Sequence, residues 1–394
     1  MRAGWQLSKL GEIYDVRDGT HDSPKYQTTG FPLITSKNLK EGELSFANVN
    51  LINELDYKKI NERSRVHKGD VLFAMIGTIG NPTLVTVEPN FAIKNVALLK
   101  IPSTQSGAFL KYYLASEAVI SKMTMEAKGT TQKFVGLGYL RDFPIPLPPL
   151  PEQHRIVAIL DAAFDHIATA RANCEANLLN ARAIFESHLQ AVFMQRGDGW
   201  EDKTLEQIAT IFGRGKSRHR PRNAAHLYGG KYPFIQTGDI RNSEHFITEY
   251  SQTYSEAGLA QSKLWPKGTI CITIAANIAE TGILDFDACF PDSVIGIVPN
   301  PKDAITGFVE YLLQSFKVRL QSLGQGSAQA NINMGTFENE KFPFPSVGEQ
   351  KQIVAKLDAL SAETRRLESL YQRKRQALDD LKKSLLHQAF SGLL

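Results

Sequence analysis

The sequence predicts an α+β (mixed α/β) protein made of two similar halves, each a globular domain followed by a long helix. Residues 152–161, Glu-Gln-His-Arg-Ile-Val-Ala-Ile-Leu-Asp, return 197 positions later as residues 349–358, Glu-Gln-Lys-Gln-Ile-Val-Ala-Lys-Leu-Asp, in a chain of 394. Each half also holds short β-like runs broken by glycine and proline, followed by a long stretch that contains neither. Such a repeat has near-twofold symmetry, and the usual ligand of a twofold protein is duplex DNA or a pair of partner subunits.

Residues 1–143 and 198–341 are expected to form the two globular domains. Short apolar runs between turn residues are typical of strands, and their mixture with helical stretches indicates an α/β or α+β domain. In the first domain we expect strands at 31–34, 70–76 and 95–100 and a helical stretch at 109–121. In the second we expect strands at 232–235, 269–274 and 293–298 and a helical stretch from Phe308 onward.

Residues 144–197 and 342–394 are expected to hold an extended proline entry and then a helix. Proline fixes φ and restricts the residue before it, so the clustered prolines that precede each repeat predict extended chain. The stretches 152–193 and 349–390 contain no proline or glycine. Forty-two residues of helix span about 63 Å, far more than a usual globular helix.

Apolar residues in both stretches recur every 3.5 positions, which predicts a coiled-coil seam. If the helices pair antiparallel, the two domains lie at opposite ends of one pair and are related by a pseudo-twofold axis. The alternative is that each helix packs on its own domain. The seam residues, expected to pair the helices or dock partner subunits, are Ile156, Leu160, Ile167, Phe185, Leu189, Ile353, Leu357, Leu360, Leu367, Leu378, Leu381 and Leu385.

Composition excludes several protein classes. Hydrophobic residues form 42% and charged residues 22% of the chain, which argues against global disorder. The net charge of +4 neither requires nor excludes nucleic acid, so a basic surface has to come from local arrangement. Three cysteines without Cys-x-x-Cys spacing argue against a disulfide framework and a zinc site. We expect a cytoplasmic protein, since no signal segment or membrane-length apolar run is present.

The strongest local signal is a basic segment at residues 212–223, in which five cations fall within nine residues. A loop of this kind, just after a predicted strand, suits phosphates and guanine edges; a solvated basic loop is the alternative. The cations are Arg214, Lys216, Arg218, Arg220 and Arg222. The matching segment of the first half is turn-rich and only mildly basic, with Thr20, His21, Lys25 and Tyr26 as its candidates.

Polar residues at matching strand ends are further candidates for DNA contact. Asn and Asp side chains can hydrogen-bond to adenine and cytosine, but turn capping is about equally expected for each of them. The strand-end candidates are Lys37, Asn38, Thr237 and Asp239, and the candidates that follow glycines further on are Gln132, Lys133, Gln329 and Asn331.

Catalytic signatures are missing from the sequence. No phosphate loop, dinucleotide fingerprint, amino-methyltransferase tetrapeptide or metal-nuclease pattern occurs, and the nine histidines form no ligand cluster. We therefore assign no catalytic residue and no metal ligand.

The plan of domain, long helix, domain, long helix resembles the specificity (S) subunits of type I restriction–modification systems. The strongest marks are the proline entries followed by the repeated decapeptide; weaker marks are Asp18-Gly-Thr-His21 with Pro24-Lys25-Tyr26, and the run 232–240. The resemblance covers nearly the whole chain.

That resemblance implies a non-catalytic, sequence-specific DNA-binding subunit. Each globular domain would be a target recognition domain that reads one half of an asymmetric bipartite double-stranded site. The helices would set the spacer and dock two adenine-N6 methyltransferase subunits, and through them the restriction subunits. S-adenosylmethionine, ATP and magnesium would sit on those partners. One alternative is an enzyme with unrecognised motifs, which binding of S-adenosylmethionine by the isolated chain would reveal. The other is a structural scaffold whose domains bind protein, which salt-insensitive behaviour toward DNA would favour.

Overall fold

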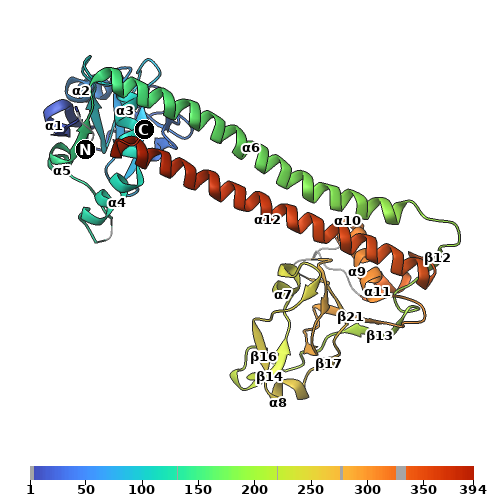
Figure 1. Cartoon of the computed structure of the whole chain (residues 1–394). Helices are drawn as coiled ribbons and strands as arrows, with labels where there is room; N and C mark the ends of the chain where they lie inside the picture. The colour runs from blue at the N-terminus through green and yellow to red at the C-terminus, as the bar shows by residue number, and fades with distance from the viewer. Residues whose placement is uncertain (1–3, 131, 220, 276–277, 325–333) are drawn as a thin grey trace. The chain divides into compact units, whose positions relative to one another are not determined.

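The computed structural model describes all residues except 1–3, 131, 220, 276–277 and 325–333. It forms two compact units, residues 1–175 with 372–394 (unit 1) and residues 176–371 (unit 2). The two long helices, α6 (Leu150–Met194) and α12 (Val347–Ser391), are each shared by both units (Figure 1). The prediction of two long helices at these places is confirmed. Within the described part of the chain, no helix is long and apolar enough to span a membrane.

Unit 1 contains an antiparallel sheet in the order β2-β10-β7-β8 and a smaller sheet in the order β6-β3-β9. Apolar residues cover both faces of the larger sheet, because alternate side chains of β7 and β10 enter two different hydrophobic clusters. The strands are β2 (Asp15–Asp18), β3 (Phe31–Ile34), β6 (Asn50–Ile52), β7 (Val71–Ala74), β8 (Gly80–Leu84), β9 (Ala92–Ile93) and β10 (Val96–Lys100). The remaining elements are β1 (Gln6–Lys9), β4 (Leu39–Lys40), β5 (Glu43–Leu44), β11 (Pro144–Leu147), α1 (Leu10–Ile13), α2 (Glu54–Ser64), α3 (Gly107–Ala115), α4 (Glu117–Glu126) and α5 (Leu137–Asp142).

The helical stretch expected near 109–121 is two helices, α3 and α4. Ser116 between them has extended backbone angles, and its Oγ donates to the carbonyl of Tyr113 at 2.7 Å. A serine that bonds its own preceding turn competes with helix continuation, which explains the break.

Unit 2 repeats this plan with sheets in the orders β13-β21-β18-β19-β15 and β16-β14-β20-β17. The strands are β12 (Glu201–Lys203), β13 (Ala209–Arg214), β14 (Tyr228–Phe234), β15 (Phe246–Ile247), β16 (Gln252–Tyr254), β17 (Leu264–Trp265), β18 (Ile270–Thr273), β19 (Thr281–Leu284), β20 (Ala288–Cys289), β21 (Val294–Pro299) and β22 (Phe342–Phe344). The helices are α7 (Thr237–Asn242), α8 (Glu256–Ala260), α9 (Thr306–Ser315), α10 (Lys317–Gly324) and α11 (Met334–Asn339). The order β2-β10-β7-β8 matches β13-β21-β18-β19, so the internal repeat extends to the sheet topology.

The proline-containing segments that lead into the two long helices form β-strands. In unit 1, β11 pairs antiparallel with β1, and in unit 2, β22 pairs in the same way with β12. Each entry therefore ties the segment before a long helix to the start of the same domain.

The repeated decapeptide anchors each helix to its globular domain. The Gln153 side chain is fully buried; its Oε1 accepts from Ser106 N at 3.0 Å and its Nε2 donates to Pro148 O at 2.9 Å. Gln350 is equally buried and bonds Ile305 N at 2.9 Å and Pro345 O at 3.0 Å.

The last residue of the decapeptide makes the second anchor. Tyr112 Oη donates to Asp161, and in the matching place Tyr311 Oη donates to Asp358 Oδ1 at 2.7 Å. The decapeptide recurs because the same docking geometry is built twice.

Replacing Gln350 with leucine is expected to lower the free energy of unfolding by about 1–3 kcal/mol, because it strips buried backbone groups of their partners. Gln153→Leu should have a similar effect in unit 1, and Gln352→Leu, at an exposed position of the same helix, serves as the control. Urea unfolding monitored by circular dichroism measures the difference. Equal midpoints for Gln350→Leu and the control would contradict this anchoring role.

The middle parts of α6 and α12 pair antiparallel through ion pairs at their rims. In unit 1, Arg171 Nη1 lies 3.0 Å from Asp379 Oδ1 and Arg375 Nη2 lies 3.6 Å from Glu175 Oε1. In unit 2, Arg182 Nε lies 2.6 Å from Glu368 Oε1. These pairs fix which residues face each other.

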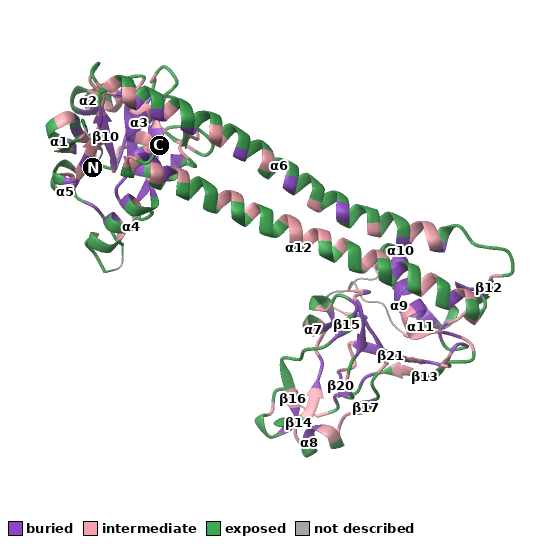
Figure 2. Cartoon of the chain, viewed as in Figure 1, coloured by how far each residue is buried: buried purple, intermediate pink, exposed green. Residues whose placement is uncertain are grey.

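Leu381 of the predicted seam is 46% exposed, which argues against a helix-pairing role for it and leaves its docking role a prediction. An α-helix has 3.6 residues per turn, so a stripe with a period of 3.5 drifts around a straight helix. By the end of α12 the buried positions are Leu386 and Ala389. Figure 2 shows buried and half-buried residues spaced along both long helices between exposed ones.

The other seam residues fall into two groups. Ile156, Leu160, Leu189 and Leu357 are buried in the domain cores, as the alternative of packing on the domains expects. Ile167 is 9% exposed, and the half-buried remainder are Phe185, Ile353, Leu360, Leu367, Leu378 and Leu385.

Candidate nucleic-acid interface

One edge of the larger sheet of unit 1 brings the first-half candidates together. Ala97 pairs with Asp18 and Val96 with Ala74, so β2 and β7 end where β10 begins. β3 and β9 run parallel and end beside this edge, where Lys94 N donates to Ile34 O at 2.8 Å. The loops that follow these strand ends carry Thr20, His21, Lys25, Tyr26, Lys37 and Asn38.

The segment that carries Gln132 and Lys133 also reaches this edge. Gly77 N, in the loop after β7, donates to Lys133 O at 3.0 Å, and Val135 N donates to Met75 O at 2.9 Å. Both side chains are exposed, and Lys133 Nζ lies 3.4 Å from Thr124 O. Candidates that are distant in the sequence thus share one edge of unit 1.

The backbone of the first loop, at Gly19, lies close against the backbone between β9 and β10. Gly19 N donates to Val96 O and Thr20 N donates to Ile93 O, both at 3.0 Å. A Cβ on Gly19 would lie 2.3 Å from the Ile93 carbonyl oxygen, so only glycine fits there.

His21 locks the start of this loop. Its Nδ1 lies 2.7 Å from Asn95 Oδ1 and its Nε2 lies 2.8 Å from Asp18 Oδ2, and Arg63 also pairs with the buried Asp18. An amide and a carboxylate thus lie on opposite sides of the ring. The hydrogen bonds to Asn95 and then Asp18 raise the pKa of His21 above 6.5.

The raised pKa of His21 predicts pH-dependent stability. A group with a raised folded pKa stabilises fully below its unfolded pKa of 6.5, and this contribution is lost as pH rises through the folded pKa. We expect His21→Ala to cost more stability at pH 5.5 than at pH 8.5, modestly, because the side chain is 60% exposed. Thermal unfolding across this range measures it, with His188→Ala as the control. A difference that does not change with pH would contradict a stabilising role of the protonated ring.

Asn38 has the capping role that the sequence left open. It is 5% exposed; its Oδ1 accepts from Thr35 N at 3.0 Å and its Nδ2 donates to Ser45 O at 3.0 Å. Its polar atoms hold the turn after β3, so we withdraw it from the DNA-reading candidates. Its neighbour Lys37, and Lys25 and Tyr26 in the first loop, are exposed.

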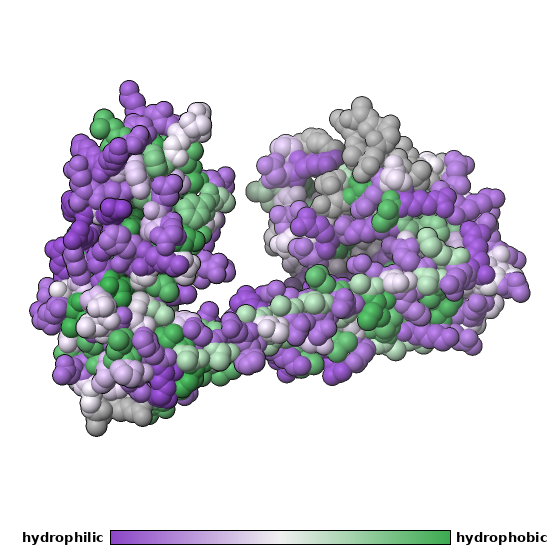
Figure 3. Space-filling view, turned by 90° about the horizontal axis from the view of Figure 1, so that it is seen from above, coloured by the Kyte–Doolittle hydropathy of each residue, from purple (hydrophilic) through white to green (hydrophobic). Residues whose placement is uncertain are grey.

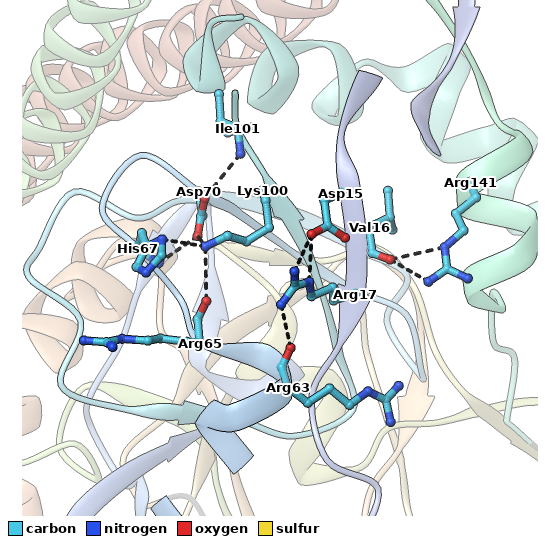
Figure 4. Close-up of polar contacts among 10 residues, drawn as sticks. All are labelled: Asp15, Val16, Arg17, Arg63, Arg65, His67, Asp70, Lys100, Ile101 and Arg141. Carbon is cyan, nitrogen blue, oxygen red and sulfur yellow. Dashed lines mark hydrogen bonds and ion pairs between the residues drawn. The ribbon is translucent and has the colours of Figure 1, made fainter. Parts of the chain in front are cut away.

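Three further cations of unit 1 are held by partners of the fold (Figure 4). Arg17 Nη2 donates to Asp15 Oδ2 at 2.6 Å, and Lys100 Nζ lies 2.6 Å from the buried Asp70 Oδ2. Arg141 Nη2 donates to Val16 O at 2.8 Å. These side chains serve the fold.

The basic segment of unit 2 begins where the His21 loop begins in unit 1. Gly215 N donates to Val294 O at 2.9 Å, and a Cβ on Gly215 would lie 2.3 Å from Phe290 O. Gly215 therefore matches Gly19, and Lys216 takes the place of Thr20. The two halves present the same backbone frame with different side chains.

Two cations of this segment have partners in the fold. Arg222 Nη2 pairs with Asp292 Oδ2 at 2.8 Å, and Arg214 Nε donates to Asp292 O at 2.8 Å. Lys216 and Arg218 are exposed, and the described residues give neither an acidic partner. Arg220, Gln329 and Asn331 lie outside the described residues.

Thr237 and Asp239 do not end a strand. β14 ends at Phe234 and α7 begins at Thr237. Asp239 Oδ2 accepts from Gln236 N at 2.8 Å and from Ser251 Oγ at 3.3 Å, so its carboxylate caps the helix. Thr237 is half-buried at the start of α7. As with Asn38, the side chain of Asp239 has the capping role that was the alternative to DNA contact.

This arrangement can contact an anionic partner. Among the described residues, no three His, Cys, Asp or Glu side chains gather as a metal site. What the described parts of both sheet edges offer is exposed cations, amides and hydroxyls on glycine-framed loops.

The family model described as "Type I restriction modification DNA specificity domain" matches residues 2–176 and again residues 197–375. The chain belongs to this family. The two matches correspond to the two halves of the repeat, and the chain is a specificity subunit of the type I restriction–modification class.

Two specificity subunits match this chain across most of their length. The chain is 22% identical to the putative type I restriction enzyme MjaX specificity subunit of Methanocaldococcus jannaschii, covering 98% of this chain and 93% of the relative. It is 25% identical to the type I restriction enzyme EcoBI specificity subunit of Escherichia coli, covering 93% and 80%.

Two solved structures share the fold. A chain from a study of complex assembly and conformational transition of the type I R-M system has a TM-score of 0.80 at 20% identity, covering 100% of this chain and 99% of that one. The HsdS subunit from Thermoanaerobacter tengcongensis has a TM-score of 0.66 at 21% identity, covering 100% and 98%.

Lys263 is a further candidate that the sequence did not indicate. Its Nζ lies 3.6 Å from the centroid of the buried Trp265 ring. Desolvation, and then the charge of Lys216, lower the pKa of Lys263. Two cations that repel each other at a surface are stabilised by an anion between them. Because this pairing is made by the fold across distant segments, no sequence signal could have found it.

Proposed function

We propose that this chain is a non-catalytic, DNA-binding specificity subunit whose two domains each read one half of an asymmetric bipartite duplex site. The observation that carries this proposal is the repeated sheet edge, in which Gly19 and Gly215 frame loops of different chemistry. Lys25 and Tyr26 are exposed side chains of one loop, and Lys216 and Arg218 are exposed side chains of the other. Like frames with unlike side chains suit two half-sites of different sequence.

The paired helices set the spacer between the half-sites and dock two adenine-N6 methyltransferase subunits. Support comes from the antiparallel ion-pair register and from the doubled anchor of Gln153 and Gln350. The restriction subunits join through the methyltransferase. The names of the relatives, which are specificity subunits of type I restriction enzymes, agree with this role.

The partner subunits, rather than this chain, would hold S-adenosylmethionine, ATP and magnesium. The resemblance to specificity subunits implies this, and the catalytic motifs that the sequence lacks agree with it. Equilibrium dialysis with labelled S-adenosylmethionine tests it: binding by the isolated chain would favour an enzyme of its own.

The deciding experiment is sequencing of N6-methyladenine in a host without DNA methylation. The chain is expressed with the methyltransferase subunit of its own system, and each is then omitted in turn. A split, asymmetric motif that needs both proteins supports the proposal. No methylation, with a methyltransferase shown to be active beside another specificity subunit, would contradict it.

A further inference from the structure

The turns that lead into β10 and β21 carry opposite charges at the two sheet edges. Lys94 lies two residues before the start of β10, and Asp292 lies two residues before the start of β21. The strands that end beside these turns differ in the same way, because β2 ends in Asp18 and β13 ends in Arg214. Figure 3 shows hydrophilic residues over much of the surface of both globular parts. At the two edges, the sign of the charges is what differs.

The register of the two sheets shows that these positions correspond. Asp18 pairs with the second residue of β10, and Arg214 pairs with the second residue of β21. The next residues, Gly19 and Gly215, each donate their N–H to the carbonyl of the first residue of the same strand, at 3.0 and 2.9 Å. The two edges therefore share one backbone frame with inverted charges.

In unit 2, Asp292 ties together the two flanks of the basic segment. Its carbonyl oxygen accepts from Arg214 Nε at 2.8 Å, and its two carboxylate oxygens accept from Arg222 Nη2 at 2.9 and 2.8 Å. The exposed Lys216 and Arg218 lie between these two arginines in the sequence. A segment that is held before it binds loses less conformational freedom on binding, which raises affinity.

In unit 1, Lys94 has the corresponding place with the opposite sign. It is 9% exposed, and its Nζ donates to Ser23 Oγ at 2.6 Å, in the loop that follows β2. Its neighbour Asn95 contacts His21 of the same loop at 2.7 Å. The described part of the chain gives Lys94 no acidic partner. A buried ammonium without a carboxylate costs stability, which points to a role in the loop rather than in the core.

We propose that Asp292 and Lys94 are positioning residues, each of which holds the DNA-reading loop of its own unit in the shape that fits its half-site. This inference rests on the proposed function and names residues that act on the reading loops without reading bases themselves. Because the two residues have opposite charges, each suits only the loop of its own unit. Half-site specificity is therefore carried by a loop together with its turn residue.

Replacing Asp292 with asparagine separates positioning from simple electrostatics, because the two predict effects of opposite sign. Removing a carboxylate beside DNA would by itself tighten binding, since the carboxylate repels phosphates. If Asp292 positions the loop, we expect about tenfold weaker binding of the target duplex and a similar loss of discrimination against an altered second half-site. Discrimination at the first half-site should not change.

Fluorescence anisotropy of the assembled complex measures these affinities, with the target duplex that methylation sequencing identifies. Asp285→Asn is the matched control, because Asp285 is also a partly exposed aspartate in an ion pair, with Lys267 Nζ at 2.7 Å. It follows β19 at the opposite end of the sheet, beside the start of β18. Ion pairs as exposed as these contribute little to stability, so both variants are expected to fold, and circular dichroism checks this.

Lys94→Met is the converse variant, and we expect it to relax the first half-site only. Unchanged or tighter target binding by Asp292→Asn, with both half-sites still discriminated, would overturn the positioning role and leave the proposed function standing. Equal relaxation of both half-sites by either variant would indicate a general structural effect and would also overturn it. A wild-type complex that discriminates neither half-site would overturn the proposed function itself.

Discussion

Alanine at Lys216 and Arg218 together is expected to weaken binding of the target duplex by the assembled complex. A side chain that reads a base contributes about 1–3 kcal/mol, equal to about a five- to 150-fold change in affinity, whereas a phosphate contact mainly lowers the salt slope by about one. Neither cation has an acidic partner among the described residues, so both are available to DNA. Fluorescence anisotropy at several salt concentrations separates the two roles.

Lys302→Ala is the matched control for this double variant. Lys302 is an exposed cation of the same domain, but it follows the other end of β21, beyond Pro299. We expect the control to retain wild-type affinity and salt slope. If the double variant does the same, this edge of unit 2 does not contact DNA.

Lys263→Ala extends the same experiment. If Lys216 and Lys263 share a phosphate, the variant should lose one unit of salt slope without a change in sequence preference. An unchanged slope would restrict the contact to the loop that follows β13.

Shortening both long helices by facing heptads is expected to shorten the spacer of the DNA target by about three base pairs. Two heptads face each other in the register set by the Arg171–Asp379, Glu175–Arg375 and Arg182–Glu368 pairs, namely residues 172–178 and 372–378. Removing seven residues shortens a helix by about 10 Å, and a base pair rises about 3.4 Å. Methylation sequencing of the variant reads the new spacer directly.

The control for this prediction is the removal of residues 172–178 alone. With one helix shortened, the ion pairs beyond the deletion lose their register, and we expect an unstable chain without a defined spacer. A folded double-deletion variant that still methylates at the original spacer would show that the helices do not set the separation of the half-sites.

The repeat allowed much of the fold to be predicted, because docking residues such as Gln153 and Gln350 leave the same pattern twice in the sequence. Local polar roles were harder to predict. Asn38 and Asp239 have side chains that suit a base edge as well as a helix cap, and only the position of the neighbouring N–H groups decides between these roles. Leu381 lies off the buried stripe of its helix because a small drift per heptad accumulates along a long helix. Lys263 could not be found, since the fold alone brings it beside Lys216.

The stretches of chain that make up the two units have a consequence for the order of folding during synthesis. Unit 2 is one continuous stretch, residues 176–371, whereas unit 1 is completed by residues 372–394. Leu386 and Ala389 are buried in the core of unit 1. The first part of unit 1 therefore cannot complete its core until a segment almost two hundred positions later has been synthesised. Unit 2 can fold its core before that segment is made. We expect translation stalled before residue 372 to leave the first domain with an exposed apolar face, and chaperones to act there.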